Sequence, residues 1–111
     1  MSEFTHLHNH FDIGSPKDSS CKIDETIKYV KSLGFTAYAI TDHARIDGWV
    51  PFNIACKKHN IKGIYGVELY EAERKASDKA LGIDNKRYHS VMLAKNQKGI
   101  QFLRKLVTFS F

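Results

Sequence analysis

The chain has 111 residues, of which 42% are hydrophobic and 26% are charged, and its formal net charge is +5. This length fits one domain and leaves no room for a second catalytic domain, and no apolar run approaches the ~20 residues that a membrane span needs. The basic balance favours a polyanionic partner such as nucleic acid, and the alternative is a solvated, lysine-rich surface.

The first residues, MSEFTHLH, lack the basic start and apolar stretch of a secretory signal, so a cytoplasmic location is expected. Cys21 and Cys56 lie far apart in the sequence and outside any CxxC pairing. We expect two reduced thiols here, and not a disulfide or a zinc ribbon.

A first strand is predicted over residues 4–8, at the start of the stretch FTHLHNHFD. In a strand, the alternate positions His6, His8 and His10 share one face. A half-buried strand would normally fill that face with Val, Ile or Leu, so three imidazoles indicate a polar occupant. A metal ion is the leading candidate.

A polar loop and a helix follow this strand. Residues 14–20, GSPKDSS, are turn formers, and the stretch 22–35 repeats apolar side chains at helical spacing. Asp24 is the expected N-cap of this helix, and Gly34 is expected to close it.

Two further strands with a helix between them are predicted next. Residues 36–41, TAYAIT, are predicted to form a buried parallel strand. Residues 51–59 are predicted to form a helix with Pro51 in its first turn, and residues 64–69 are predicted to form a third strand. The alternation of strand and helix predicts a parallel α/β sheet. Trp49, in the connection before the helix, could contact a substrate or pack as a lid.

The last third of the chain begins with the charged stretch 71–87, which we expect to be a surface excursion or a short mobile helix. A fourth strand is predicted over residues 88–94. The stretch 95–111 has apolar residues at helical spacing, including Leu103 and Val107, and is predicted to form a third helix.

Polar side chains with metal-binding or acid–base chemistry gather where the predicted strands end. His8 and His10 follow the first strand, Asp42 and His43 the second, and Glu68 lies near the end of the third. The carboxyl ends of parallel strands meet at one edge, where α/β proteins build their sites. Asp18, in the first loop, can reach the same edge.

His89 stands at the start of the fourth strand. If that strand ran parallel to the third, His89 and Glu68 would lie at opposite ends of the sheet. An antiparallel hairpin brings them together, so we predict an antiparallel return through the charged stretch.

Histidine and carboxylate ligands without thiolates suit Zn, Mn or Fe, and bridging carboxylates allow two or three ions. Such clusters activate water and stabilise charge on a phosphoryl group, which suggests phosphoester hydrolysis. His6 is either a ligand or a packed or supporting side chain, and His59 is expected at the surface.

Four segments, HLHNH, AITDHARIDG, GIYGVELY and YHSVMLAKNQKGIQFLRKLV, occur in an order that resembles the PHP (polymerase and histidinol phosphatase) domain of bacterial DNA polymerase III alpha subunits. The resemblance covers residues 4–109. The stretches ACKKHNIKGIYGVELY and LAKNQKG favour the polymerase branch over the phosphatase branch.

The resemblance implies a seven-stranded (β/α) barrel that binds up to three Zn or Mn ions, and in some members 3′–5′ exonuclease activity. Carried onto this chain, the metal ligands are His8, His10, Asp18, His43, Glu68 and His89. Among them His8, His10, His43 and Glu68 would be catalytic. Asp12 competes with Asp18, because the first loop is one residue longer than the usual polymerase pattern.

The family's later ligands, a cysteine or histidine and a final DxH pair, would follow Phe111, and the polymerase active site is absent from this chain. Residues 1–111 are therefore expected to be the N-terminal portion of a PHP domain, a partial PHP-type α/β barrel comprising about the first half. The expected partners are DNA, a second polymerase fragment or another copy of the chain, with no membrane. The alternative to a phosphoesterase is a non-catalytic interaction module or a remnant that pairs with another chain.

Overall fold

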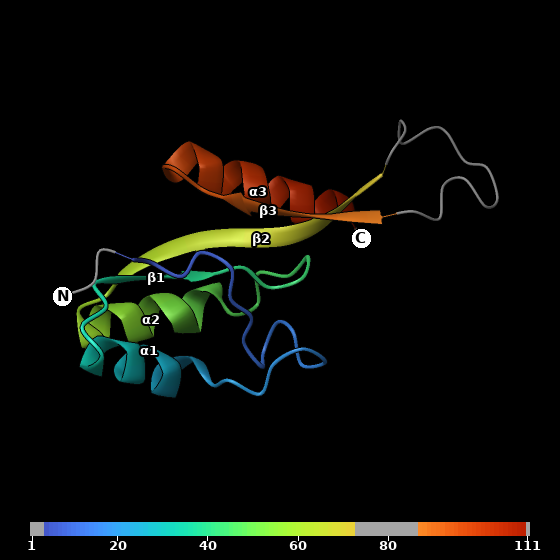
Figure 1. Cartoon of the computed structure of the whole chain (residues 1–111). Helices are drawn as coiled ribbons and strands as arrows, with labels where there is room; N and C mark the ends of the chain where they lie inside the picture. Colours follow the sequence, from blue (N-terminus) through green and yellow to red (C-terminus); the bar gives the residue numbers. More distant parts are fainter. Residues whose placement is uncertain (1–3, 73–86, 111) are drawn as a thin grey trace.

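The computed structural model of the chain describes residues 4–72 and 87–110. Three strands form one sheet in the order β1 (Ala37–Ile40), β2 (Lys62–Ala72) and β3 (Arg87–Leu93). Three helices accompany it, α1 (Ile23–Ser32), α2 (Trp49–His59) and α3 (Gln97–Ser110). The protein is therefore a mixed α/β fold, and in Figure 1 α1 and α2 lie beyond β1 while α3 lies beyond β2 and β3.

The sheet changes its pairing mode along β2. Residues 62–65 of β2 pair in parallel with β1, and residues 66–72 pair antiparallel with β3. This arrangement confirms both the predicted parallel pair and the predicted antiparallel return. The predicted excursion between β2 and β3 falls mostly in residues 73–86, which lie outside the described residues.

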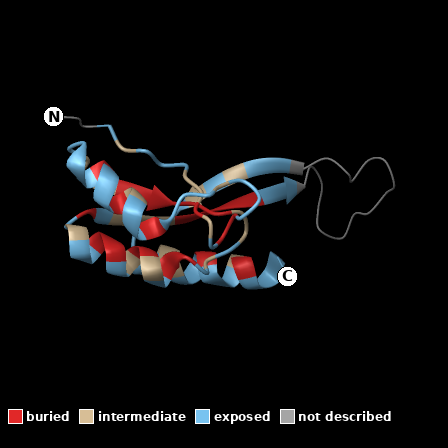
Figure 2. Ribbon diagram, turned by 90° about the horizontal axis from the view of Figure 1, so that it is seen from below, coloured by how far each residue is buried: buried red, intermediate tan, exposed pale blue. Residues whose placement is uncertain are grey.

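One apolar core joins all three helices to one face of the sheet. Val67 and Leu69 of β2 belong to the same buried cluster as Ile27 of α1, Phe52 of α2 and Leu103 of α3. Side chains alternate along a strand, so Glu68, between Val67 and Leu69, points to the opposite face. Figure 2 shows the buried residues on the inner sides of the elements and the exposed residues along the outer sides of the helices.

The predicted strand at residues 4–8 is wrong. Residues 4–10 form no strand, because side chains next to β1 take the hydrogen bonds that a ladder would use. Asn9 donates its backbone N–H to Thr41 Oγ1 (2.8 Å) and its side-chain amide to the Ala39 carbonyl (3.1 Å). The single backbone bond between these segments runs from the Thr41 N–H to the Asn9 carbonyl (3.0 Å).

The prediction for the C-terminal end of α1 is confirmed, whereas the predicted N-cap residue of this helix is wrong. Gly34 adopts a φ of +92° just after α1, a conformation that suits glycine, and this confirms its predicted role. Asp24 is not the N-cap, because Lys22 occupies that position and Asp24 lies in the first turn. The Asp24 carboxylate instead contacts His59 Nε2 at 3.0 Å.

Two side chains of α2, Trp49 and His59, have partners elsewhere in the fold. α2 begins at Trp49, which is buried and donates its indole N–H to the Gly66 carbonyl at 3.4 Å, so Trp49 packs within the fold. The His59 side chain is only 15% exposed, because it faces Asp24 on α1. His59 therefore lies at the surface in a contact between the two helices that covers part of its side chain. Within residues 4–72 and 87–110, no helix has the length and apolar character to cross a membrane.

The contact between Asp24 of α1 and His59 of α2 is expected to make the free energy of unfolding depend on pH. The hydrogen bond from His59, with the charges of Lys58 and Lys28 nearby, lowers the pKa of Asp24 below 3.8. A lowered carboxyl pKa contributes stability above the unfolded pKa, and that stability is lost as the pH falls through the folded value. We expect Asp24→Asn to lower the urea midpoint at pH 7 more than at pH 3. Equal losses at both pH values, measured by urea titration, would contradict this role.

Candidate metal centre

Glu68 is the centre of the site. It lies on β2 with only 4% of its surface exposed, and its backbone is fixed on both sides. The Glu68 N–H donates to the Asp42 carbonyl (3.0 Å), and the Glu68 carbonyl accepts from the Ala44 N–H (2.9 Å). These bonds extend the parallel pairing beyond β1, so the connection after Thr41 lies directly beside Glu68.

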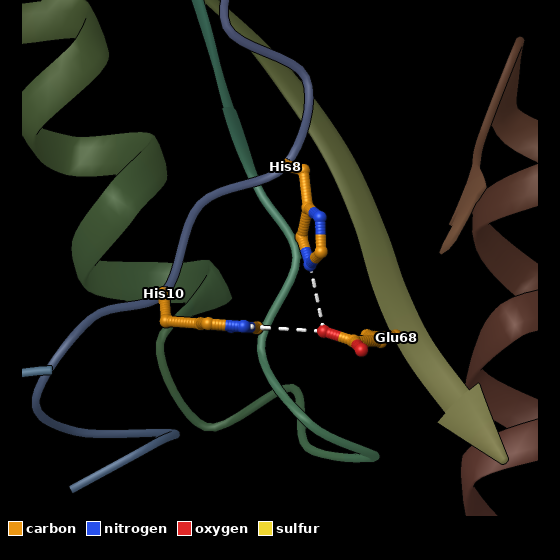
Figure 3. A group of neighbouring side chains, drawn as sticks. All are labelled: His8, His10 and Glu68. Carbon is orange, nitrogen blue, oxygen red and sulfur yellow. Dashed lines mark hydrogen bonds and ion pairs between the residues drawn. The ribbon is translucent and has the colours of Figure 1, made fainter. Parts of the chain in front are cut away.

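His8 and His10 reach Glu68 from the N-terminal segment, as Figure 3 shows. His8 Nε2 lies 2.7 Å from Glu68 Oε1, and His10 Nε2 lies 3.1 Å from the same oxygen. The two histidines therefore share one side of the chain, although the segment is not a strand. His6 does not join them, because its ring stacks on Phe35 with a centroid separation of 5.5 Å.

His43 and Asp18 form the next part of the site. His43 Nε2 lies 3.1 Å from Asp18 Oδ2, and His43 Nδ1 lies 3.7 Å from Glu68 Oε1. The His43 ring also stacks on the His10 ring, with centroids 4.4 Å apart. Of the two candidate carboxylates in the first loop, Asp18 is the one that reaches His43, and no contact of Asp12 with the cluster occurs among the described residues.

His89 completes the cluster from β3. The antiparallel register places His89 opposite Tyr70 and Val91 opposite Glu68, so His89 and Glu68 share a face of the sheet. His89 Nδ1 makes a close contact with Glu68 Oε2, the oxygen that His8 and His10 leave free. The four predicted histidine ligands therefore meet at Glu68, and Asp18 joins the cluster through its contact with His43.

Asp42 supports the site through buried hydrogen bonds to the first loop, a role that the sequence did not predict. This carboxylate is 1% exposed and accepts hydrogen bonds from the Phe11 N–H (2.8 Å) and the Ser15 hydroxyl (2.9 Å). A Cβ at Gly14 would lie 2.3 Å from Asp42 Oδ2, so only glycine fits there. Burial raises the pKa of Asp42, and the two hydrogen bonds offset only part of that effect.

The electrostatics of Glu68 differ from those of Asp42. Burial opposes ionisation of the Glu68 carboxyl, but hydrogen bonds from His8 and His89 and the nearby imidazole of His43 outweigh it and lower the Glu68 pKa. Glu68 is therefore held as a carboxylate, which is the form that binds a metal.

The donor set fits divalent metals. His8, His10 and Glu68 form one group, and His43, Glu68 and His89 form a second, with the ligand atoms of each group within 4.8 Å of one another. Ligands of one tetrahedral ion, with bonds of about 2.0–2.2 Å, lie about 3.3–3.6 Å apart, somewhat further than the hydrogen-bond distances of 2.7 and 3.1 Å that separate the imidazoles of His8 and His10 from Glu68. Glu68 is common to both groups, as a bridging carboxylate is.

Unpaired polar atoms lie in the same cluster. Among the described residues, His10 Nδ1, His43 Nδ1 and Asp42 Oδ2 are buried without a hydrogen-bond partner. Buried polar atoms normally have partners, and exceptions mark strain, catalysis or a missing ion. Two of the three atoms belong to predicted ligands, so a metal fits the arrangement.

A cavity of about 240 Å³ opens beside the centre. His8, His10 and Asp18 line one part of it, and Tyr38 and the exposed Cys21 line another. Both cysteines are free, as predicted, and Cys56 is buried. The cavity gives a small molecule access to the predicted ligands.

Comparisons with known proteins agree with this geometry. The profile of the family described as the PHP domain matches residues 6–111. Proteins named DNA polymerase III subunit alpha are similar to almost the whole chain: that of Borreliella burgdorferi is 37% identical over 99% of the chain, and that of Aquifex aeolicus 35% identical over 98%. The matched region is 10% of the length of each of these relatives.

The fold also has a solved counterpart. A structure from Bifidobacterium adolescentis, described as a metal-dependent phosphoesterase, superposes with a TM-score of 0.64 over 91% of this chain and 32% of its own length. The sequence identity is 16%, so this likeness concerns the fold.

Proposed function

The chain belongs to the PHP domain family, and from this premise we propose that it is a metal-dependent phosphoesterase module of a DNA polymerase III alpha subunit, with chemistry of the 3′–5′ exonuclease type. The observation that carries the proposal is the convergence of four imidazoles on the single carboxylate of Glu68. We further propose that residues 1–111 are the N-terminal portion of the domain and that the sheet is part of a seven-stranded barrel. The protein would act in the cytoplasm, with DNA as its partner.

In this proposal His8, His10, Asp18, His43, Glu68 and His89 hold Zn or Mn. Bound metals would polarise a water molecule and offset the negative charge that develops on a phosphoryl group. Glu68 contacts His8 and His10 through one oxygen and His89 through the other, so one carboxylate would serve both groups of predicted ligands.

The first loop also positions His43. Asp18 holds His43 from the side opposite Glu68, and the His43 N–H donates to Ser15 Oγ at 3.1 Å. Asp42 in turn receives the Ser15 hydroxyl hydrogen bond. The substrate phosphate would enter through the cavity beside His8 and Asp18.

The proposal predicts a difference between neighbouring histidines. We expect the double variant His8→Ala, His10→Ala to lose Mn-dependent hydrolysis of a labelled single-stranded oligonucleotide by more than about 100-fold, since lost ligands should cost more than the roughly 10–100-fold of lost supporting bonds. His6→Ala is the matched control, because His6 stacks on Phe35 away from Glu68, and it should keep its activity. Equal activity of the double variant and the control would refute the catalytic assignment.

A second candidate, a non-catalytic interaction module, is favoured by one observation. A groove of about 540 Å³ is lined by both apolar and polar residues, and the exposed Leu7 and Leu93 are among the apolar ones. A second polymerase fragment or another copy of the chain could cover this groove. If the metal-loaded chain hydrolyses no phosphoester but sediments as a dimer, this second function replaces the first.

A further inference from the structure

The positive charge of the protein is concentrated at one end of the sequence. Residues 85–111 contain six Lys or Arg and no Asp or Glu, whereas residues 1–84 contain 11 basic and 12 acidic residues and have a net charge of −1. The net charge of +5 therefore comes entirely from the last 27 residues. Most of the described part of this segment is β3 and α3, so these two elements and the connection between them carry the excess of positive charge.

α3 presents this charge on its outward face. Leu103 and Val107 are buried against the sheet, and the opposite side of the helix carries the exposed Lys98 and Lys105. Arg104 is also exposed and, with Lys105, lines a hollow on the outer side of α3. No carboxylate occurs anywhere in α3, so no acidic group on this helix neutralises these cations.

Two phenylalanines lie beside the cations. Phe102 is 58% exposed and Phe109 is 86% exposed, although residues of this kind are normally buried. Each follows a lysine by four residues, Lys98 before Phe102 and Lys105 before Phe109, so each pair shares one side of the helix. The two pairs are seven residues apart, which is about 10.5 Å along the helix axis.

From this arrangement we propose that the outward face of α3 binds single-stranded nucleic acid. Lys98, Arg104 and Lys105 contact the phosphates, and unpaired bases stack on Phe102 and Phe109. Non-sequence-specific single-strand binders combine a basic track with exposed aromatic rings in this way, because every base has a face that can stack. A duplex hides its base faces and would leave the phenylalanines without a role.

This surface is separate from the metal centre and does not depend on the phosphoesterase proposal. Lys98, Phe102, Lys105 and Phe109 lie on α3, whereas the predicted ligands lie in residues 8–43 and on β2 and β3. Figure 1 shows α3 beyond β2 and β3, and α1 and α2 beyond β1, so lysines on α1 and α2 provide distant controls.

The test is fluorescence anisotropy of the full chain with a labelled oligothymidylate in EDTA, which removes metal from the reaction. We expect binding that weakens as salt rises. The double variant Lys98→Gln, Lys105→Gln should weaken binding at least about tenfold. It should also reduce the slope of log K against log salt by about 1.4, because each single-strand phosphate contact contributes about 0.7. The double variant Phe102→Ala, Phe109→Ala should weaken binding about tenfold for each ring removed, and should leave the slope of log K against log salt unchanged.

Matched control variants remove lysines and an aromatic ring from α1 and α2 instead of α3. Lys28→Gln, Lys57→Gln and Tyr29→Ala take exposed lysines and an exposed aromatic ring from α1 and α2, and should leave the affinity within about twofold. Absence of binding by the wild type, equal losses in the controls, or full affinity of the Phe102→Ala, Phe109→Ala variant would each overturn the proposal. Equally tight binding of a duplex would also overturn it, and would indicate a phosphate-only surface.

Discussion

Replacing Glu68 with glutamine is expected to remove both metal groups at once. Glu68 belongs to the group with His8 and His10 and to the group with His43 and His89, so loss of its charge removes a ligand from each. Glutamine keeps the volume of the side chain, which separates the loss of charge from a packing defect. Elemental analysis of the purified chain should therefore show Zn or Mn in the wild type and almost none in Glu68→Gln.

Single-histidine variants provide the comparison. His8→Ala should lose metal from the first group and retain the second, and His89→Ala should do the reverse, because each histidine belongs to one group only. Their metal content should lie between those of the wild type and Glu68→Gln. If Glu68→Gln held as much metal as the wild type, Glu68 would not be the shared ligand.

Replacing Asp42 with alanine is expected to cost about 2–3 kcal/mol of unfolding free energy, because it leaves the Phe11 N–H and the Ser15 hydroxyl buried without their acceptor. This corresponds to a fall in Tm of roughly 10 °C for a domain of this size. Metal affinity should fall as well, since Ser15 also accepts the N–H of the predicted ligand His43. Thermal unfolding followed by circular dichroism measures the first effect, and calorimetric titration with Zn measures the second.

Asp47→Ala is the matched control for Asp42→Ala. Asp47 lies five residues further along the same connection, but its carboxylate is half exposed and pairs with Arg45 at the surface. Such pairs contribute about 0–1 kcal/mol, so the Tm of Asp47→Ala should stay near that of the wild type. If the two variants lost the same stability, the buried hydrogen bonds of Asp42 would not explain its effect.

The sequence predicted the elements whose patterns come from burial. Ile27 and Val30 in α1 and Leu103 and Val107 in α3 recur at helical spacing because one side of each helix packs on the core. The antiparallel return was predicted from the site itself, since only that geometry brings His89 to Glu68. Local periodicity and the chemistry of the strand ends thus predicted most of the elements, and the resemblance to the PHP domain added the set of six predicted ligands.

The N-terminal segment shows where this reasoning fails. The alternation of His8 and His10 suggested a strand, but it reflects the position of Glu68 and not a hydrogen-bonded ladder. The bonds of Asn9 to Thr41 and Ala39 depend on which chain lies beside β1, and no local pattern contains that information.

The support given by Asp42 was equally hidden. Its position at a strand end was evident, but its partner is the backbone N–H of Phe11, a group that every residue except proline carries. The close approach of Gly14 to the Asp42 carboxylate indicates this supporting role, but it is visible only once the fold is known. Supporting contacts of this kind become visible in three dimensions, whereas ligand chemistry can be read from residue type.

The contact between His8 and Glu68 joins residues 60 positions apart, and the bond from Phe11 to Asp42 spans 31. Closing such long loops costs chain entropy before any contact forms, so pairings of this kind are made late and slow the folding of a domain. A partly folded chain that has formed α1, α2 and the pairing of β2 with β3 still lacks the first group of predicted ligands. Refolding monitored by metal uptake should therefore lag behind helix formation, and metal occupancy would report the fraction of molecules that has completed folding.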